Sequence, residues 1–190
     1  MSGEPGTEAI LRHWREAVPD DRLAHLVKDA TRALVRALQM RLAEHAVSFG
    51  HWTFLRILWE GDRLTQRELS ERAGVMEPTT FAALKAMERL GYIRRRKFTG
   101  DRKKTYVLLT AKGRTLRGRL VPLAEEVNRI AVRGVKPAAI ATTRGVLMSI
   151  IENMAHDESA ADMKMPSTRA LAGIRTKSAT RRRKNPAAHS

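Results

Sequence analysis

A run of basic residues, RRRKFTGDRKKTYV at positions 94–107, carries the strongest chemical signal in the sequence. It holds seven Lys or Arg residues and a single acid, Asp101, around a Thr-Gly pair. Extending the run to Arg119 gives eleven cations against that one acid, a net charge of +10 in 26 residues. Guanidinium and ammonium groups bind phosphate oxygens, so the run predicts a surface for a polyanion such as nucleic acid.

The composition of the whole chain agrees with such a partner and excludes several other classes. The 190 residues carry a formal net charge of +16, and 43% of them are hydrophobic, enough for the core of one domain with extensions. Cysteine is absent, which excludes disulfides, thiol nucleophiles and thiol-based oxidant sensing. Neither a signal-peptide pattern nor a run long enough to span a membrane occurs. We therefore expect a cytoplasmic protein that has no membrane partner.

The basic run has the pattern of a β-hairpin. YIRRRKF and KTYVLL both alternate between apolar and polar residues, and TGDR between them predicts the turn. Two short helices precede the hairpin. Thr65 and Glu68 have the spacing of a capping box at the start of the first, which Gly74 ends, and EPTTFAALKAMERLG predicts the second, with Thr80, Leu84 and Met87 facing inward. A helix-turn-helix followed by a basic hairpin is a winged helix.

Longer helices are expected on both sides of this lobe. Apolar residues at three- and four-residue steps predict a helix from Asp21 to about Ala46, preceded by a short helix in EAILRHWREAV that Pro19 ends. Ser48 is placed to cap the next helix, on which Trp52 and Trp59 belong to the inward stripe. After the hairpin we expect a helix from Thr110, interrupted or bent near Pro122, and a last helix over about 137–154.

Several of these segments together resemble the multiple-antibiotic-resistance regulator (MarR) family. LTQRELSERAGV, ALKAMERLGYIRRR, GDRKKTYVLLTAKGR and VPLAEEVN carry the resemblance, which covers roughly residues 21–155. It implies a homodimer with interlocked terminal helices, two winged lobes that read a pseudo-palindromic operator in double-stranded DNA, and a repressor released by a small, often aromatic, acidic effector. No other cofactor is implied.

The resulting fold class is mostly α with a small β-hairpin wing: a winged helix-turn-helix lobe plus a helical dimerisation region. We assign an N-terminal extension, partly helical, to residues 1–20, the dimerisation region to 21–47 and 110–155, and the DNA-binding lobe to 48–109. Residues 156–190 are expected to form a disordered basic tail. Its last 28 residues hold eight Lys or Arg and no acid.

The second helix of the helix-turn-helix is expected to read DNA with an unusual outward face. Phe81 and Ala82 cannot donate hydrogen bonds, so thymine-methyl contacts and DNA shape should carry more of the readout than bidentate pairing to guanine. Thr79 and Lys85 would hold phosphate and register, and Thr65 and Gln66 would lie near a phosphate at a helix N-terminus.

In the wing, Arg102 is the predicted minor-groove residue, and the neighbouring Arg96 and Lys103 are further DNA-binding candidates. Asp101 would orient Arg102 or a neighbouring Arg; the alternative is that it is an ordinary turn acid.

The effector site is less visible in the sequence. Trp14 lies in the amphipathic segment ahead of the first long helix, which could fold over the lobe and close a pocket. Together with His25, His51 and Arg56 it would suit an aromatic carboxylate, because flat rings stack and cations bind the acid group. For any single one of these four residues a structural role is favoured over ligand contact, whereas the four together favour a pocket. Trp52 and Trp59 are assigned to core packing.

Other functional classes have weaker support. No Gly-rich phosphate loop, metalloprotease motif or nucleophile elbow occurs, so we do not expect an enzyme. The histidines lack the spacing of metal ligands, so no metal site is expected. The alternative that stays open is an architectural, nucleoid-type DNA-binding protein without ligand sensing, in which wing and tail bind any sequence. The sequence does not identify the effector or the operator.

Overall fold

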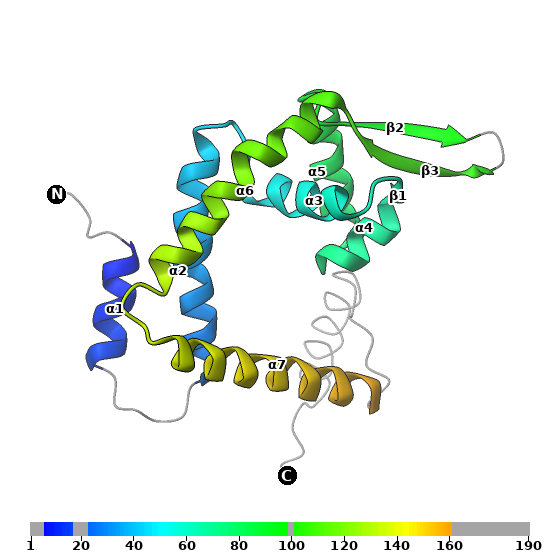
Figure 1. Ribbon diagram of the computed structural model, residues 1–190. Helices are drawn as coiled ribbons and strands as arrows, with labels where there is room; N and C mark the ends of the chain where they lie inside the picture. The colour runs from blue at the N-terminus through cyan, green and yellow to red at the C-terminus, as the bar shows by residue number, and fades with distance from the viewer. Residues whose placement is uncertain (1–5, 17–22, 99–100, 161–190) are drawn as a thin grey trace, which may run out of the picture. The chain divides into compact units, whose positions relative to one another are not determined.

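The computed structural model describes residues 6–16, 23–98 and 101–160; the side chains of 101–103 lie outside the description. The described residues fall into two units that divide between Arg133 and Gly134. The first unit contains a helical region and a winged lobe (Figure 1). The second consists of a single helix, α7 (Pro137–Ala160).

Three helices make up the helical region of the first unit: α1 (Gly6–Glu16), α2 (Leu23–Ala43) and α6 (Ala111–Ala131). Helices α2 and α6 lie side by side (Figure 1), and an ion pair joins them where Arg41 Nε lies 3.2 Å from Glu126 Oε2. Helix α1 contacts α2 through Trp14, whose indole N–H donates to Asp29 Oδ2 at 3.1 Å.

The winged lobe combines three helices with a small antiparallel sheet of three strands in the order β1-β3-β2. Its helices are α3 (Phe49–Glu60), α4 (Gln66–Ala73) and α5 (Glu77–Arg89), and its strands are β1 (Leu64–Thr65), β2 (Ile93–Phe98) and β3 (Asp101–Leu109). The hairpin of β2 and β3 extends beyond the lobe's helices (Figure 1). These elements confirm the predicted fold class, with β1 as a strand that the sequence pattern did not predict.

One continuous core joins the lobe to the helical region. It contains apolar side chains from α2, α3, α4, α5, α6 and all three strands. Trp52 is 6% exposed and packs edge to face against Trp59, with ring centroids 5.6 Å apart. The Trp59 indole N–H donates to the carbonyl of Gly113 at 2.9 Å. Both tryptophans therefore have the packing role that was expected of them.

Several predicted element bounds are confirmed by local capping. The Ser48 hydroxyl accepts the N–H of His51 at the start of α3, and the Thr110 hydroxyl accepts that of Gly113 at the start of α6. Gly74 adopts φ 63° after α4. This left-handed conformation ends the helix without the Cβ strain that another residue would meet.

Four bounds differ from the sequence-based expectation. Helix α2 ends at Ala43, and the chain turns at 44–46 with Ala46 at a positive φ of 57°. Helix α6 runs through Pro122 without interruption, because the loss of one backbone hydrogen bond does not stop a helix that is packed on α2. The other expectation for Pro122, a bend, stays a prediction. Strand β3 already includes Asp101 and Arg102, which the pattern assigned to the turn. Helix α7 continues to Ala160, so residues 156–160 are helical rather than disordered.

Helix α7 contains no buried residue. Its exposed large apolar side chains are Val146, Leu147, Met148, Ile151 and Met154. The rest of the segment predicted to be a disordered basic tail, residues 161–190, lies outside the described residues.

Candidate nucleic-acid interface

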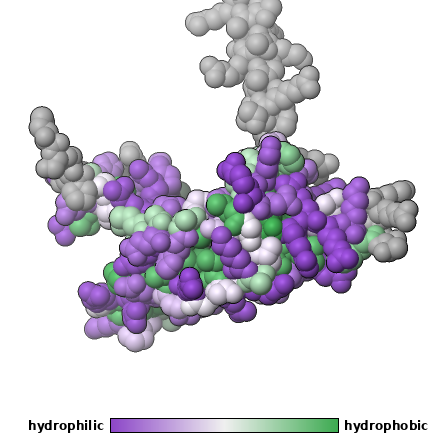
Figure 2. Space-filling model, turned by 90° about the horizontal axis from the view of Figure 1, so that it is seen from above, coloured by the Kyte–Doolittle hydropathy of each residue, from purple (hydrophilic) through white to green (hydrophobic). Residues whose placement is uncertain are grey.

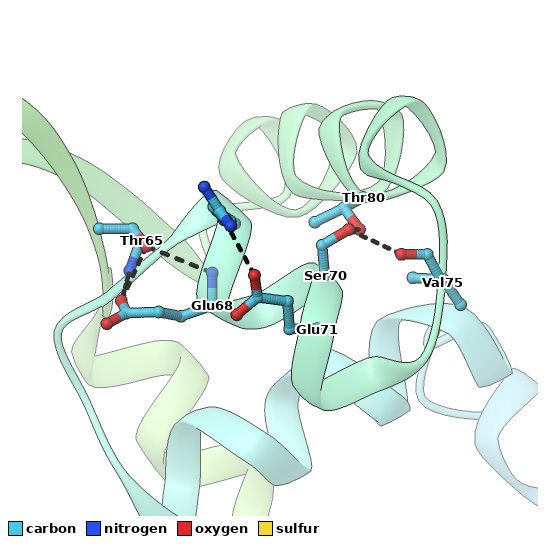
Figure 3. Close-up of polar contacts among 7 residues, drawn as sticks. Thr65, Glu68, Ser70, Glu71, Val75 and Thr80 are labelled. Carbon is cyan, nitrogen blue, oxygen red and sulfur yellow. Dashed lines mark hydrogen bonds and ion pairs between the residues drawn. The ribbon is translucent and has the colours of Figure 1, made fainter. Parts of the chain in front are cut away.

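Helix α5 is held in the lobe by its inward stripe and by a buried pair of hydroxyls. Leu84, Met87 and Thr80 are fully buried, as the spacing predicted. The Thr80 hydroxyl lies 3.0 Å from that of Ser70 on α4, and the Ser70 hydroxyl donates to the carbonyl of Val75 at 2.7 Å (Figure 3). These hydrogen bonds join the two helices of the helix-turn-helix across their turn, and thereby fix the angle at which α5 leaves the lobe.

The opposite side of α5 is exposed, as a DNA-reading face requires. Thr79, Phe81, Ala82 and Lys85 are all exposed, and Phe81 retains 48% of its accessible surface. An apolar ring this exposed gains by contacting another apolar group, such as the methyl group of thymine. The four residues predicted on α5 therefore share one accessible face.

Glu88 joins the exposed face of α5 to strand β2. Its Oε1 accepts the backbone N–H of Arg95 at 3.1 Å, and its Oε2 lies 3.2 Å from Arg95 Nε. The Nε–H has no hydrogen bond of good geometry, so the second contact is an ion pair. The guanidinium also lies over the ring of Phe81, with Cζ 5.5 Å from the ring centroid. Arg95 belongs to the basic run, but the sequence pattern does not indicate that its partners lie on α5.

The N-terminus of α4 is closed by the predicted capping box (Figure 3). Glu68 Oε2 accepts both the backbone N–H and the hydroxyl of Thr65, each at 2.7 Å, and the Glu68 N–H donates back to the Thr65 hydroxyl at 3.3 Å. The backbone N–H of Thr65 and then its hydroxyl lower the pKa of Glu68. A phosphate reaching the Thr65 hydroxyl would have to displace the Glu68 carboxylate. The half-buried Gln66 side chain is not bonded to that carboxylate.

The wing carries its cations on exposed positions around an aromatic pair. Arg94, Arg96, Lys97 and Lys104 are exposed, and Figure 2 shows hydrophilic residues next to the grey hairpin tip. The Phe98 and Tyr106 rings pack edge to face with centroids 5.5 Å apart. Arg96 lies over the Phe98 ring at 5.6 Å, so this predicted DNA-binding residue is held on the hairpin surface.

A second arginine on Phe98 comes from outside the hairpin. The guanidinium carbon of Arg63, in the loop between α3 and β1, lies 4.3 Å from the Phe98 ring centroid. Arg63 has a positive φ of 69°, which is uncommon for a residue with a side chain. The contact ties the wing to the lobe. Arg63 was not among the predicted site residues, because nothing in its local sequence indicates a partner 35 residues away.

Three predicted wing residues are described only by their backbone. Asp101, Arg102 and Lys103 belong to strand β3, where Asp101 pairs with Phe98 across the hairpin. Their side chains lie outside the described residues. Whether Asp101 orients Arg102 stays a prediction.

Asp62 supports the base of the wing. Its Oδ1 accepts the backbone N–H of Leu109 at 2.9 Å and that of Arg63 at 3.1 Å, and its Oδ2 accepts from Arg114 at 3.0 Å. One carboxylate thus connects the α3–β1 loop, the end of β3 and the start of α6. The positions of strand β3 and of Arg63 are therefore coupled.

The four candidate effector residues are distributed over three helices. Trp14 on α1 is hydrogen-bonded to Asp29, which lowers the pKa of that carboxyl, and His25 on α2 and Arg56 on α3 are exposed. Burial lowers the pKa of His51 on α3, whose Nδ1 is buried without a hydrogen-bond partner. No hydrogen bond, ion pair or ring contact joins any two of these four residues.

Residues 6–16, 23–98 and 101–160 contain neither a metal site nor a membrane-spanning helix. No group of His, Cys, Asp or Glu in that part of the chain could hold a metal ion. None of its helices is long and apolar enough to cross a membrane.

Comparison with known proteins agrees with the geometry of the lobe. Residues 47–105 match the model of the MarR family. The regulator TtmR of Methylorubrum extorquens is 32% identical over 109 residues, which span 57% of this chain and 56% of that protein. The homoprotocatechuate degradative operon repressor of Escherichia coli is 29% identical over 109 residues, 57% of this chain and 74% of the repressor.

A solved structure shares the fold over a larger part of the chain. It describes the regulation of DNA binding of Bordetella bronchiseptica BpsR by 6-hydroxynicotinic acid, and it superposes with a TM-score of 0.61 at 19% identity. The match covers 73% of this chain and 96% of that structure. At this identity the likeness establishes the fold alone.

Proposed function

We propose that this chain, whose winged lobe is a MarR-family domain, is a dimeric, sequence-specific DNA-binding regulator that represses transcription until a small aromatic acid releases it. The observation that carries the proposal is the exposed face of α5, with Phe81, Ala82 and Lys85, in the same lobe as the cationic hairpin. Such a lobe offers a helix for the major groove and a wing for the neighbouring backbone or minor groove. The setting we propose is the cytoplasm.

Dimerisation is supported by the surface of α7. None of the 24 residues of this helix is fully buried, and its exposed large apolar side chains include Ile151 at 61% exposure. An apolar helix surface of this kind is usually covered by a partner. A second copy of the same chain is the partner we propose, because two lobes are needed to read the two halves of a palindrome.

The effector class is supported by two relatives and by the candidate residues. The E. coli relative is named a repressor of the degradation of homoprotocatechuate, an aromatic acid, and the BpsR structure concerns regulation by 6-hydroxynicotinic acid. In this chain, the half-buried His51 ring lies edge to face with Tyr92, with ring centroids 6.4 Å apart, and Arg56 is exposed on the same helix. We propose that His51 and Arg56, with His25 and Trp14, contribute to the effector site.

The proposal for the wing is tested by Arg102→Ala. Losing a minor-groove arginine should weaken binding to the specific site by about 1–3 kcal/mol. The matched control is Arg15→Ala, which removes the same charge from the exposed surface of α1 and should leave specific binding nearly unchanged. Equal affinities of the Arg102 and Arg15 variants would show that the wing does not read DNA through Arg102.

An architectural DNA-binding protein without a sensing role is the second candidate, and the eight cations of residues 163–190 favour it. Each phosphate that they neutralise would add about −0.9 to the slope of log K against log salt concentration. A chain ending at Asp162 should bind random DNA more weakly and with a flatter slope, while its dimerisation and its preference for the specific site persist. If the full chain already binds the specific site and random DNA equally, the architectural candidate is favoured. A truncated chain that is monomeric would show that the tail has another role.

A further inference from the structure

An acidic residue lies on the face of α5 that is proposed to meet DNA. Phe81, Lys85 and Glu88 are spaced four and then three residues apart, so they form one exposed stripe along the helix. A carboxylate there would repel the phosphate backbone unless a cation neutralises it. The structure supplies that cation from strand β2, in the side chain of Arg95.

The Arg95 side chain bridges the two ends of this stripe. It is paired with Glu88 Oε2 at 3.2 Å, and its guanidinium carbon lies 5.5 Å from the Phe81 ring centroid. Phe81 and Glu88 are seven residues apart, about 10 Å along a helix axis. A planar guanidinium can satisfy both contacts, because it stacks on an aromatic face while its edge meets a carboxylate.

The backbone of Arg95 makes a separate contact that any residue except proline could make. Its N–H donates to Glu88 Oε1 at 3.1 Å, and this bond joins β2 to the end of α5 without using the Arg95 side chain. The guanidinium is therefore not required for that attachment. Its contribution is the position of the Phe81 ring and the neutralisation of Glu88.

We propose that Arg95 is a positioning residue that determines DNA specificity: it holds the Phe81 ring in the orientation that contacts thymine methyl groups and cancels the charge of Glu88 beside it. The proposal rests on the proposed DNA-binding function. Arg95, on strand β2, would thus be a determinant of base readout that lies outside helix α5. The planar shape of the arginine is what matters, since lysine at the same place would keep the charge without stacking on the ring.

The test is Arg95→Lys, measured on the full chain with a binding site selected from random-sequence DNA. In that site each thymine is replaced in turn by uracil, which removes only the methyl group. The unchanged protein should lose about fivefold or more in affinity at one or more of these positions, the loss of one base contact. For the lysine variant, the same replacement of thymine by uracil should lower affinity by less than about twofold. The affinity of this variant for random DNA should equal that of the unchanged protein within about twofold.

Two further variants make the outcome decisive. Arg94→Lys is the matched control, because Arg94 is the exposed strand neighbour and points to the other face of the sheet, and it should keep the full uracil penalty. Phe81→Leu should lose the penalty as Arg95→Lys does. Thermal melting of each variant shows that the lobe is folded.

The proposal is overturned if Arg95→Lys keeps the full uracil penalty, if Phe81→Leu keeps it, or if the unchanged protein shows no penalty at any position. A protein that binds selected and random DNA equally would instead contradict the proposed function itself. Failure of the specificity role and failure of the DNA-binding function are thus distinguished by the unchanged protein.

Discussion

At the scale of single residues, the buried hydroxyl of Thr80 shows how the helix-turn-helix obtains a defined angle. Thr80 is fully buried, and its hydroxyl lies 3.0 Å from that of Ser70 and 3.3 Å from the carbonyl oxygen of Met76. Because Ser70 gives its proton to Val75, Thr80 donates its single proton to one of these two acceptors. A buried hydroxyl costs stability unless it is hydrogen-bonded. The pair thus restricts the lobe to arrangements that keep both bonds.

Replacing Thr80 by Val should therefore lower the free energy of unfolding by about 1 kcal/mol, because it removes the hydrogen bond between the helices while preserving side-chain shape. Urea unfolding followed by circular dichroism measures the change. Thr79→Val, at the exposed neighbouring position, should change the free energy by less than about 0.5 kcal/mol. Equal effects of the two variants would show that the buried pair contributes nothing specific.

His51 makes stability depend on pH. Its pKa is lowered from the usual 6.5 by burial, so the unfolded chain takes up a proton at a higher pH than the folded chain does. Stability should therefore fall as pH decreases below about 6.5, with a slope of at most about 1.4 kcal/mol per pH unit. The lowered carboxyl pKa values of Asp29 and Glu68 act in the same direction but at lower pH.

The measurement compares urea unfolding at pH 7 and pH 5 for the unchanged protein and for His51→Phe. The variant should show a smaller loss of stability between these pH values, since phenylalanine does not titrate. The exposed His25 provides a control, and His25→Gln should keep the loss. A His51→Phe variant with the same pH dependence as the unchanged protein would assign the effect to other groups.

At the scale of elements, the start of α6 approaches the backbone of Tyr92, between α5 and β2, too closely for any side chain. A Cβ on Gly113 would overlap the carbonyl oxygen of Tyr92, whereas a Cβ on Gly118, one and a half turns further along α6, would meet nothing within 4 Å. The same substitution should therefore have opposite effects at the two positions.

Gly113→Ala should destabilise the lobe by about 1–3 kcal/mol, because the backbone of Tyr92 must move. Gly118→Ala should raise stability by about 0.5–1 kcal/mol through the higher helix propensity of alanine. Melting temperatures of the two variants give the comparison directly. A tolerated alanine at Gly113 would contradict the described packing of α6 on the lobe.

The wing depends on a contact from outside the hairpin. Phe98 lies between Arg63 and Arg96 at 4.3 and 5.6 Å, so it holds one cation of the hairpin and connects the hairpin to the α3–β1 loop. Phe98→Leu should weaken DNA binding about two- to fivefold although no charge is lost, because exposed cation–π contacts contribute about 0.5–1 kcal/mol each. Phe98→Tyr, which keeps the ring, should bind normally; a leucine variant that binds equally well would show that the wing needs no such support.

The sequence predicted those elements whose signals are local. The Thr65–Glu68 capping box, the Gly74 cap and the alternation of the hairpin each lie within a few residues, and each is confirmed. Strand β1 was missed because it has two residues and forms only by pairing Leu64 and Thr65 with distant β3. The contacts of Arg63 and Arg95 were missed for the same reason, since their partners are set by tertiary packing.

At the scale of the whole molecule, the surface combines a cationic wing with apolar residues that remain exposed (Figure 2). The formal charge of +16 gives affinity for any polyanion, and this term alone does not select a sequence. In the proposed function, selectivity comes from the exposed face of α5, which carries Phe81, and from the pairing of two lobes. The balance between these two contributions separates a regulator from an architectural protein.

The most direct test of the regulator proposal is the affinity of the full chain for its selected site and for random DNA at one fixed salt concentration, with and without a panel of hydroxylated aromatic and heteroaromatic acids. We expect the full chain to bind the selected site about 10³-fold or more tightly than random DNA, and to lose this preference when one of the acids is present. Equal affinity for every duplex, unchanged by every acid, would contradict it.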